Sequence, residues 1–315
     1  MKSIKIAIIG AGNMAREHIK AFQAIENVTI AGIHSRTYQR ASELAIEFHI
    51  PINTSSIGEL HQATQADLVI VTVPELQANK VAKECFKFDW TVLLEKPAGY
   101  HLKDAYDIAE ASLTCKKPTF VGLNRRFYDS SRKILDDLAQ KNEARYVHIQ
   151  DQQSYEEARH YNHPEEVVEN FMYANSIHNI DLINYFCRGD IIDVNPIVPW
   201  QGEASQIALA YITFSSGDSA LYEGIWKGPG PWACTVSTPS RRWVMQPLET
   251  ASFQNAGERK LNSIEINSID KSYKAGFYLQ AQEICKAVRN EPNNAITIKE
   301  SLKTMELISQ IFNKN

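Results

Sequence analysis

The sequence predicts a doubly wound parallel α/β domain followed by an α+β domain, whose sheet is large, open and mostly antiparallel with helices on one face. Two observations predict the first domain. Short apolar runs alternate with helical stretches over residues 4–122, and a glycine-rich turn follows the first run. This alternation is typical of right-handed β-α-β units. From residue 123 onward, β-rich segments separated by turns such as SSGDS and KGPGP replace the alternation and predict the second domain, 123–315.

The elements can be placed in order from their apolar periodicity and turn residues. In the first domain, strands are expected at 4–9, 28–34, 68–73, 91–94 and 119–122, with helices at 14–24, 38–48, 77–86 and 103–115. In the second domain, helices at 130–141 and 165–186 flank a strand at 145–153. Further strands are expected at 191–198, 206–214, 220–226, 233–238, 242–246 and 261–266. Helices at 273–289 and 299–312 close the chain, and we expect the last to pack back on the first domain.

Composition excludes several classes of protein. The 315 residues carry a net charge of −4 and no lysine or arginine run, so nucleic acid and anionic membrane are poor candidate partners. The N-terminus lacks a signal-peptide pattern and no 18-residue apolar run occurs, so we expect a cytoplasmic protein. Five scattered cysteines without CxxC spacing favour reduced, mostly buried thiols over disulfides or a metal site.

The glycine-rich turn GAGNMA at 10–15 connects the first strand to the first helix. Gly10 would permit a tight turn, Gly12 would let a pyrophosphate approach the backbone, and Ala15 would allow close packing of the helix on the strand. The strand–turn–helix context favours this dinucleotide-binding (Rossmann) motif over a plain tight turn. The residues of the turn predicted to bind the cofactor are Gly10, Gly12, Asn13 and Met14.

The end of the second strand distinguishes NADP from NAD. An acidic residue there binds the ribose 2′-hydroxyl of NAD, whereas an arginine accommodates the 2′-phosphate of NADP. This chain carries Ser35 and Arg36, with Arg40 one helical turn later. Ser35 and Arg36 are therefore predicted to bind the cofactor, with NADP favoured over NAD. A solvated arginine at a strand end is the alternative.

The buried strand 91–94 ends on two charges, Glu95 and Lys96, followed by Pro97. Because a dinucleotide lies across the carboxyl ends of the strands, Lys96 would emerge beside the nicotinamide. Its ammonium could stabilise the alkoxide that forms as hydride leaves, while Glu95 positions it and a cis Pro97 fixes the turn. A surface ion pair would leave the apolar run unexplained.

The sequence resembles the glucose–fructose oxidoreductase and inositol dehydrogenase (Gfo/Idh/MocA) family over nearly its whole length. The shared motifs are GAGNMA, TVP at 72–74, EKPAG, VGLNRRF at 121–127 and ANSIHNIDLINYF from 174. The resemblance implies oxidation or reduction of a sugar or cyclitol hydroxyl with a tightly held nicotinamide nucleotide. It implies that Lys96 is catalytic and that the cofactor also contacts Thr72, Val73, Pro74, Glu95 and Lys96.

The chain departs from the family's second catalytic motif, DxGxHxxD. Aligned on the histidine, His178 takes the acid/base position and Asp181 the final aspartate, but Ala174 replaces the first aspartate and Ser176 the glycine. Alone, His178 could be a core histidine bonded to Asp181; in the family context we expect it to move the proton. Either Lys96 and His178 suffice, or Asn175 orients the substrate, or the proton relay is weakened.

The residues predicted to bind substrate are Asn124, Arg126, Asn175 and His178. One guanidinium of the Arg125–Arg126 pair could meet an anionic group such as a diphosphate, and an interdomain salt bridge is as good an explanation. We therefore expect a sugar oxidoreductase acting on nucleotide-linked sugars of surface polysaccharide synthesis. A nucleotide-binding regulator that has lost turnover is the alternative. Four tryptophans of the second domain could stack on a sugar, but core or interface positions are more common: Trp200, Trp226, Trp232 and Trp243.

Strand 206–214 predicts assembly, because it is apolar on both faces. Ile207, Leu209 and Tyr211 fall on one face, and small or apolar residues fall on the other. Helices of the domain can cover one face, and the same sheet of a second copy would cover the other. The family resemblance also implies pairing through this sheet, so we expect a homodimer or a dimer of dimers.

Overall fold

The computed structural model describes residues 3–314, which form two compact units. The first unit comprises the chain up to Asn124 together with Lys271–Leu302. The second unit comprises Arg125–Asp270 together with the chain from Lys303 onward. No helix within residues 3–314 combines the length and apolar character needed to cross a membrane. All five cysteines are free thiols and four of them are buried, as expected from their spacing.

The first unit contains a six-stranded sheet in which every strand pair is parallel, as predicted. Its order is β3-β2-β1-β4-β5-β6, so the strand order reverses between β1 and β4. In open α/β sheets this reversal marks where ligands bind, beyond the carboxyl ends of the strands. The strands are β1 (Ile4–Ile9), β2 (Val28–His34), β3 (Ile52–Thr54), β4 (Leu68–Val71), β5 (Thr91–Leu94) and β6 (Thr119–Val121).

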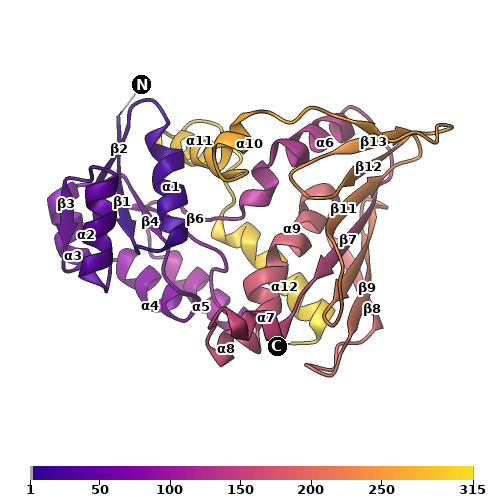
Figure 1. Cartoon of the computed structure of the whole chain (residues 1–315), viewed down its shortest axis with the longest axis horizontal. Coiled ribbons are helices and arrows are strands. Elements are labelled where there is room, and N and C mark those ends of the chain that lie inside the picture. The colour runs from indigo at the N-terminus through magenta and orange to yellow at the C-terminus, as the bar shows by residue number, and fades with distance from the viewer. Residues whose placement is uncertain (1–2, 315) are drawn as a thin grey trace. The chain divides into compact units, whose positions relative to one another are not determined.

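Central strands of this sheet are buried on both faces, which explains their continuous apolar sequences. All residues of β4 and β5 are buried. The covering helices are α1 (Asn13–Gln23), α2 (Tyr38–Glu47), α3 (Ile57–Thr64), α4 (Glu75–Cys85), α5 (Leu102–Ser112) and α11 (Phe277–Val288). Helix α11 lies beside α1 (Figure 1), where Phe277, Ala281 and Ile284 join the core with Ile19 and Phe22.

The second unit contains an eight-stranded sheet of order β14-β13-β12-β11-β7-β10-β9-β8. Its pairs are antiparallel except for β7 and β10, which run parallel, so the expected mostly antiparallel sheet is confirmed. The strands are β7 (Tyr146–Gln152), β8 (Ile191–Val198), β9 (Ile207–Phe214), β10 (Ser219–Ile225), β11 (Trp232–Ser237), β12 (Arg241–Met245), β13 (Ser252–Asn255) and β14 (Asn262–Ser263).

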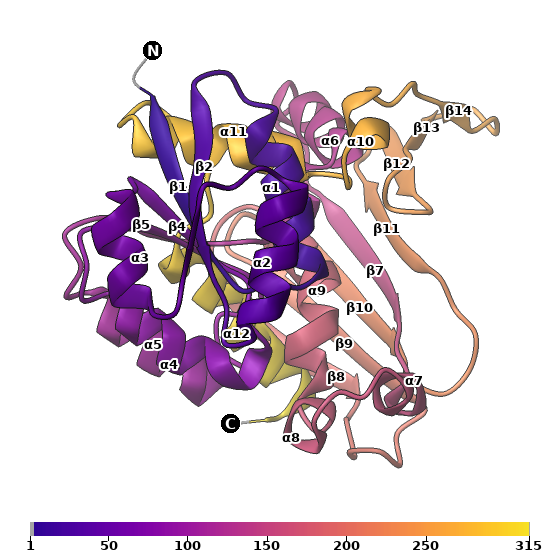
Figure 2. The same ribbon diagram turned by 60° about the vertical axis from the view of Figure 1, so that its left-hand side comes forward.

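Helices cover one face of this sheet, with α9 (Ile177–Phe186) packed on β7 and β11 (Figure 2). The remaining helices include α6 (Asp129–Ala139), α7 (Tyr155–His160) and α8 (Glu165–Val168). Helix α10 (Ile269–Ser272) and helix α12 (Ile298–Phe312) each cross the division between the two units. On β9, Ala208, Ala210, Ile212 and Phe214 are buried, whereas Ile207 and Tyr211 on the other face are exposed.

The expected single helix over 165–186 is wrong, because the chain forms three segments there. Helix α8 ends at Val168, a π-helical turn spans Met172–Ser176, and α9 begins at Ile177. A π turn inserts one residue into a helix and rotates the side chains that precede it relative to those that follow. The turn lies directly before His178, the candidate acid/base residue.

Candidate functional site

Gly10 holds a tight turn that no other residue could form without strain. Its φ is +110°, and a Cβ added there would lie 2.5 Å from the carbonyl oxygen of Thr72. The Gly10 amide donates to the His34 carbonyl (2.8 Å), so the turn is fixed between the ends of β2 and β4. The structure therefore brings together Gly10 and Thr72, two of the residues predicted to bind the cofactor.

Gly12 is the open part of the same turn. It is exposed and caps the N-terminus of α1, and a Cβ built on it would meet nothing within 4 Å. The first turn of α1 contains no acidic residue, and the cap makes no side-chain hydrogen bond. No side chain therefore caps the backbone N–H groups of this turn, and such N–H groups at a helix N-terminus favour the binding of an anion. The turn fits a dinucleotide pyrophosphate: Gly12 leaves the space that a pyrophosphate needs, and Asn13 and Met14 follow it in α1.

The end of β2 carries Ser35 and Arg36, the two residues predicted from the sequence to bind the cofactor there. His34 is the last residue of the strand, and its Nδ1 lies 3.0 Å from the Thr54 carbonyl oxygen of neighbouring β3. Ser35 follows, half-buried, and Arg36 is exposed. No acidic residue stands at the strand end to bind a ribose 2′-hydroxyl.

Lys96 follows β5, whose register places Leu94 beside Val71 at the carboxyl edge of the sheet. The Glu95 amide donates to the Val71 carbonyl (2.9 Å), which extends the β4–β5 pairing by one residue. Lys96 itself is half-buried, and the peptide bond between Lys96 and Pro97 is cis, as predicted. Thr72 and Val73, which follow β4 at the same edge, are half-buried, whereas Pro74 is exposed.

Glu95 is held by a buried histidine that the sequence reasoning missed. His18 on α1 is 1% exposed, and its Nε2 lies 2.7 Å from Glu95 Oε1. The other carboxylate oxygen, Oε2, accepts from the Lys96 amide (3.1 Å). Burial acts to raise the pKa of Glu95, but the hydrogen bond from His18 and the charges of His18 and Lys96 outweigh it and lower the pKa below its usual value. A signal was present, because helical spacing puts His18 on the buried face of α1 with Ala15 and Phe22.

In the second unit, His178 lies on the first turn of α9 and is 7% exposed. Ala174, at the position of the family's aspartate, is buried in the π turn. Asp181 accepts hydrogen bonds from Arg126 at both oxygens (2.7 Å each) and from Thr304 (2.7 Å). Arg126 thus has a structural partner within its own unit, and its contact with substrate stays a prediction.

A second buried carboxylate, Asp151, lies on β7 near the π turn, and the sequence reasoning missed it. Its Oδ1 accepts from Gln153 Nε2 (2.7 Å) and Asn179 Nδ2 (2.6 Å), and its Oδ2 accepts from the Tyr222 hydroxyl (2.8 Å). Burial raises the pKa of Asp151 despite these donors. A period-two pattern was the available signal, because Asp151 and Gln153 fall on the same, core-facing side of β7 as Val147 and Ile149.

The Asp151 network also fixes Asn175. Gln153 donates its amide to Asp151, so its Oε1 is left to accept from Asn175 Nδ2 (2.8 Å). Asn175 is half-buried and three residues before His178. Its Oδ1 is then the atom that can accept a hydrogen bond from a ligand hydroxyl, in a segment where the family aspartate is absent.

Two other sets of predicted residues have structural partners. Asn124 is 4% exposed and donates to the Ala275 carbonyl (2.9 Å) within the first unit, so its role in binding substrate stays a prediction. Trp226 and Trp243 are 2% and 4% exposed, which makes them core residues and unsuitable as a stacking wall. Trp232 lies under the guanidinium of Arg125.

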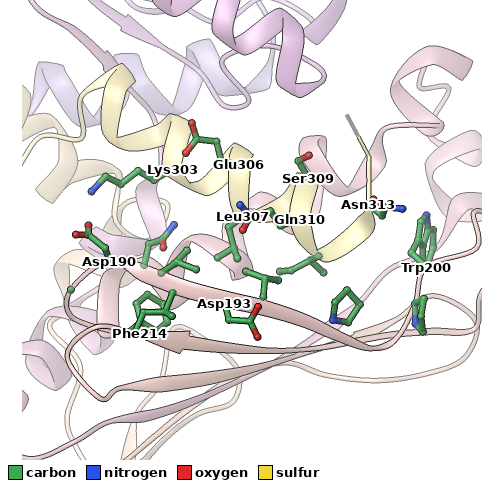
Figure 3. A pocket seen from close by; sticks show the side chains of 18 residues that line it. Asp190, Asp193, Trp200, Phe214, Lys303, Glu306, Leu307, Ser309, Gln310 and Asn313 are labelled. Atoms are coloured by element: carbon green, nitrogen blue, oxygen red, sulfur yellow. The ribbon is translucent and has the colours of Figure 1, made fainter.

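A separate cavity of about 940 Å³ lies within the second unit. None of the residues predicted for catalysis, cofactor or substrate binding lines it, although Trp200, one of the four tryptophans considered for sugar stacking, does. Figure 3 shows its two walls. Lys303, Glu306 and Gln310 of α12 form one wall, and Asp190 and Asp193 at β8 form the other. Acidic and basic side chains both line the cavity, so its chemistry does not indicate one class of ligand.

Comparison with known proteins shows similarity over the first unit's sheet and over the whole chain. Residues 4–123 match the Gfo/Idh/MocA model, described as an oxidoreductase family with an NAD-binding Rossmann fold. The 4-carboxy-2-hydroxymuconate-6-semialdehyde dehydrogenase of Sphingobium sp. is 23% identical over 309 residues, covering 93% of each chain.

Solved structures share the fold over nearly the full length. The aldose-aldose oxidoreductase of Caulobacter crescentus superposes with a TM-score of 0.83 at 16% identity, covering 99% of this chain and 97% of that one. The UDP-N-acetylglucosamine 3-dehydrogenase GnnA of Acidithiobacillus ferrooxidans gives a TM-score of 0.78 at 16% identity, covering 100% and 98%. With the glycine turn and the EKP sequence in their expected places, residues 4–123 match the NAD-binding Rossmann domain of the Gfo/Idh/MocA oxidoreductase family, and the similarity to a relative of 23% identity extends over 93% of the chain.

Proposed function

We propose that the protein transfers hydride between NADP(H) and a hydroxyl or keto carbon of a sugar. The observation that carries this proposal is the placement of Lys96 in the first unit. Lys96 follows β5, and the glycine turn follows β1, so both leave the carboxyl edge of one parallel sheet. A dinucleotide on the turn would lie along that edge, and a lysine there has a chemical use beside the nicotinamide.

The proposed chemistry divides between two residues. The bound nicotinamide accepts or supplies the hydride. In the oxidising direction, the carbon gives up a hydride, the hydroxyl proton passes to His178, and the Lys96 ammonium stabilises the negative charge that develops on the oxygen. The salt-bridged Glu95 fixes the backbone at Lys96 through its hydrogen bond to the Lys96 amide.

NADP is the proposed cofactor because of the second strand end. Arg36 can pair with a 2′-phosphate and stack on adenine, and the Ser35 hydroxyl can donate to the same phosphate. Neither residue would repel NAD strongly. We therefore propose a preference for NADP, and expect Arg36→Asp to reverse it.

A sugar, and specifically a nucleotide-linked sugar of surface polysaccharide synthesis, is the proposed substrate. The names of similar proteins support a hydroxyl or carbonyl substrate with a polar body, including UDP-N-acetylglucosamine and aldoses. In the second unit, the Oδ1 of Asn175, set by Gln153, suits a hydroxyl-rich ligand. The proposal includes action in the cytoplasm and assembly as a homodimer or dimer of dimers.

A nucleotide-binding regulator without turnover is the second candidate, and Ala174 is the observation that favours it. Loss of the family aspartate removes a carboxylate one helical turn before His178. Lys96 and His178 are both retained, although a regulator would have no chemical use for the pair. The oxidoreductase is therefore the better-supported function.

Turnover of NADP(H) separates the two candidates. Wild-type protein is assayed spectrophotometrically against free sugars, polyols and nucleotide-linked sugars, beside Lys96→Met and the control Lys87→Met, which changes an exposed lysine of the same unit. Lys96→Met should lower kcat by about 10²–10⁴ while nucleotide binding is kept, because it removes the group that stabilises the alkoxide. A fully active Lys96→Met protein would refute the mechanism, and turnover of free polyols alone would refute the nucleotide-sugar substrate.

A further inference from the structure

The two neighbouring arginines of the NRRF sequence, Arg125 and Arg126, are bonded in different ways. Arg126 makes a bidentate salt bridge to Asp181, through Nε and Nη2, at 2.7 Å to each oxygen. Asp181 is 1% exposed, so this is a buried, charge-compensated pair. The guanidinium of Arg126 therefore already has a planar carboxylate partner of its own.

Arg125 has no such partner. Its guanidinium lies over the indole of Trp232, with Cζ 4.8 Å from the ring centroid. Within residues 3–314 this guanidinium donates no hydrogen bond and forms no ion pair, and its Nε is shielded from solvent. Trp232 is itself fixed, because its Nε1 donates to the Gln152 carbonyl (2.6 Å). A charged group with several N–H donors thus lies over the indole, and no side chain or carbonyl within residues 3–314 accepts a hydrogen bond from it.

The surroundings do not compensate the charge. Burial lowers the pKa of Arg125, and the charges of Tyr128, Glu249 and Asp151 only partly oppose this. Asp151 is the buried carboxylate among them, and both its oxygens already accept from Gln153, Asn179 and Tyr222. A guanidinium stays protonated at neutral pH. Arg125 is half-buried, so water reaches part of it, and an anion from outside these residues would supply the counter-charge that none of them provides.

We propose that Arg125, whose guanidinium lies over the Trp232 ring, is a binding site for an oxyanion of the substrate, a carboxylate or a phosphate. The guanidinium edge presents parallel N–H donors that match the two oxygens of such a group, whereas a neutral hydroxyl would leave the charge unpaired. Consecutive residues of the chain connect this site to Asn175: the Gln152 carbonyl holds Trp232, and the Gln153 side chain holds Asn175. That the oxyanion belongs to the substrate rests on the proposed function.

Calorimetric titration tests the site without turnover. Wild type, Arg125→Gln, Arg125→Lys and the control Arg242→Gln, an exposed arginine of the same unit, are titrated with malonate, inorganic phosphate, D-glucuronate, D-glucose 6-phosphate and D-glucose. Wild type should bind at least one oxyanion class and bind it more tightly than D-glucose. Arg125→Gln should weaken that binding by about 30-fold or more, the lower range for removing one partner of a buried charge pair. Arg125→Lys should fall between, since lysine keeps the charge and loses the fork.

Comparison of the carboxylate ligands with the phosphate ligands identifies which kind of oxyanion the site binds. Two other results would refute the site. Absence of oxyanion binding by wild type, or unchanged binding by Arg125→Gln, would overturn it. Thermal melts guard against misfolding: Arg125→Gln should melt close to the wild-type temperature, because the substitution removes the contact with Trp232 but no hydrogen bond. A lower melting temperature together with retained oxyanion binding would show a structural arginine.

The test of the Arg125 site can fail or succeed independently of the test of the oxidoreductase activity. Oxyanion binding that depends on Arg125, in a protein that turns over no nicotinamide nucleotide, would keep this site and refute the oxidoreductase. Turnover confined to neutral sugars, with oxyanion binding unaffected by Arg125→Gln, would refute this site and keep the oxidoreductase.

Discussion

At the scale of single residues, the His18–Glu95 pair explains how a strand can end on two charges. Desolvating Glu95 is unfavourable, and the Nε2 of His18, 2.7 Å from Oε1, is the main compensation. His18 also packs on Phe277, with ring centroids 4.8 Å apart, so it cannot swing away from the carboxylate without losing that contact. The pair therefore stabilises the turn that presents Lys96.

Removing His18 should destabilise the first unit. His18→Leu leaves a buried carboxylate without its strongest partner, and the free energy of unfolding should fall by about 1.5–3 kcal/mol. Denaturant melts of His18→Leu, Glu95→Gln, the double variant and the exposed control Glu110→Gln measure the coupling. Additive effects of the two substitutions would show that the hydrogen bond does not stabilise the fold.

The pH dependence of the same pair has a definite sign. Because the folded state lowers the pKa of Glu95 below its ordinary 4.5, ionised Glu95 stabilises the protein above that pH. The stability advantage of wild type over Glu95→Gln should be full at pH 7 and disappear as the pH falls below 4.5 and through the folded-state pKa. An advantage that grew on acidification would contradict this account.

Ionisation of Asp151 should affect the stability of the fold in the opposite direction to ionisation of Glu95. Asp151→Ala leaves the amides of Gln153 and Asn179 and the hydroxyl of Tyr222 without their acceptor. It should lower the free energy of unfolding by at least about 3 kcal/mol. Asp151→Asn can keep an oxygen toward Gln153 and Asn179 and donate to Tyr222. Since burial raises the pKa of Asp151, ionisation reduces stability as the pH rises through that pKa. Asp151→Asn should thus be as stable as wild type, or more so, at pH 7 in denaturant melts; equal loss in both variants would contradict the network.

At the scale of elements, the glycine turn separates a structural glycine from a binding glycine. Gly10→Ala would place a Cβ 2.5 Å from the Thr72 carbonyl oxygen at a φ of +110°, so it should lower stability by about 1–3 kcal/mol or more. Gly12 has φ −98° and nothing within 4 Å of a Cβ, so Gly12→Ala should melt like wild type.

The same Gly12→Ala variant should bind NADP(H) at least about tenfold more weakly, since its methyl group occupies the space a pyrophosphate needs. Fluorescence titration with NADPH measures this, and thermal melts provide the stability of both variants. Tight NADPH binding by Gly12→Ala would show that the cofactor does not use this turn.

Elements with strong periodicity could be predicted from sequence, and short polar ones could not. The apolar runs of β1, β4 and β5 and the turn at Gly10 identify the parallel sheet and its cofactor edge. Strand β3 and helix α3 escaped prediction because β3 has only three residues, although Ser56, which accepts from the Glu59 amide, was a usable helix-start signal. The π turn at Met172–Ser176 is buried on most sides, so no amphipathic pattern marks it.

The site was predictable where chemistry is local in sequence and missed where it is not. Lys96 and its cis Pro97 follow from the strand that precedes them. The partners of Glu95 and Asn175 come from distant elements, α1 and β7, and only the fold brings them together. Periodicity could have identified His18 and Asp151 as polar residues facing a core, although neither was predicted, and it could not have identified their partners.

At the scale of the whole molecule, the exposed face of the eight-stranded sheet predicts self-association. Tyr146 of β7 is 38% exposed, and Ile207 and Tyr211 of β9 are 43% and 37% exposed. Neither strand lies at an edge of the sheet. Exposed apolar side chains gathered on one sheet face are typical of an interface. We expect a dimer or a dimer of dimers that buries this face.

Light scattering at micromolar concentration measures the assembly. Wild type should show a multiple of the 35.6 kDa chain mass, and Tyr211→Glu should shift it toward the monomer by placing a charge in the interface. Ile46→Glu, on the exposed face of α2, is the matched control and should not change the mass. A wild-type mass of 35.6 kDa would contradict the prediction.

The most direct measurement of the central claim follows the hydride itself. Protein is incubated with NADPH deuterated at C4 and the keto form of a sugar that it turns over, and the product is analysed by NMR and mass spectrometry. The account predicts deuterium on the carbinol carbon of the product, formed about 10²–10⁴ more slowly by Lys96→Met. Product without deuterium, or an undiminished rate of transfer in Lys96→Met, would contradict it.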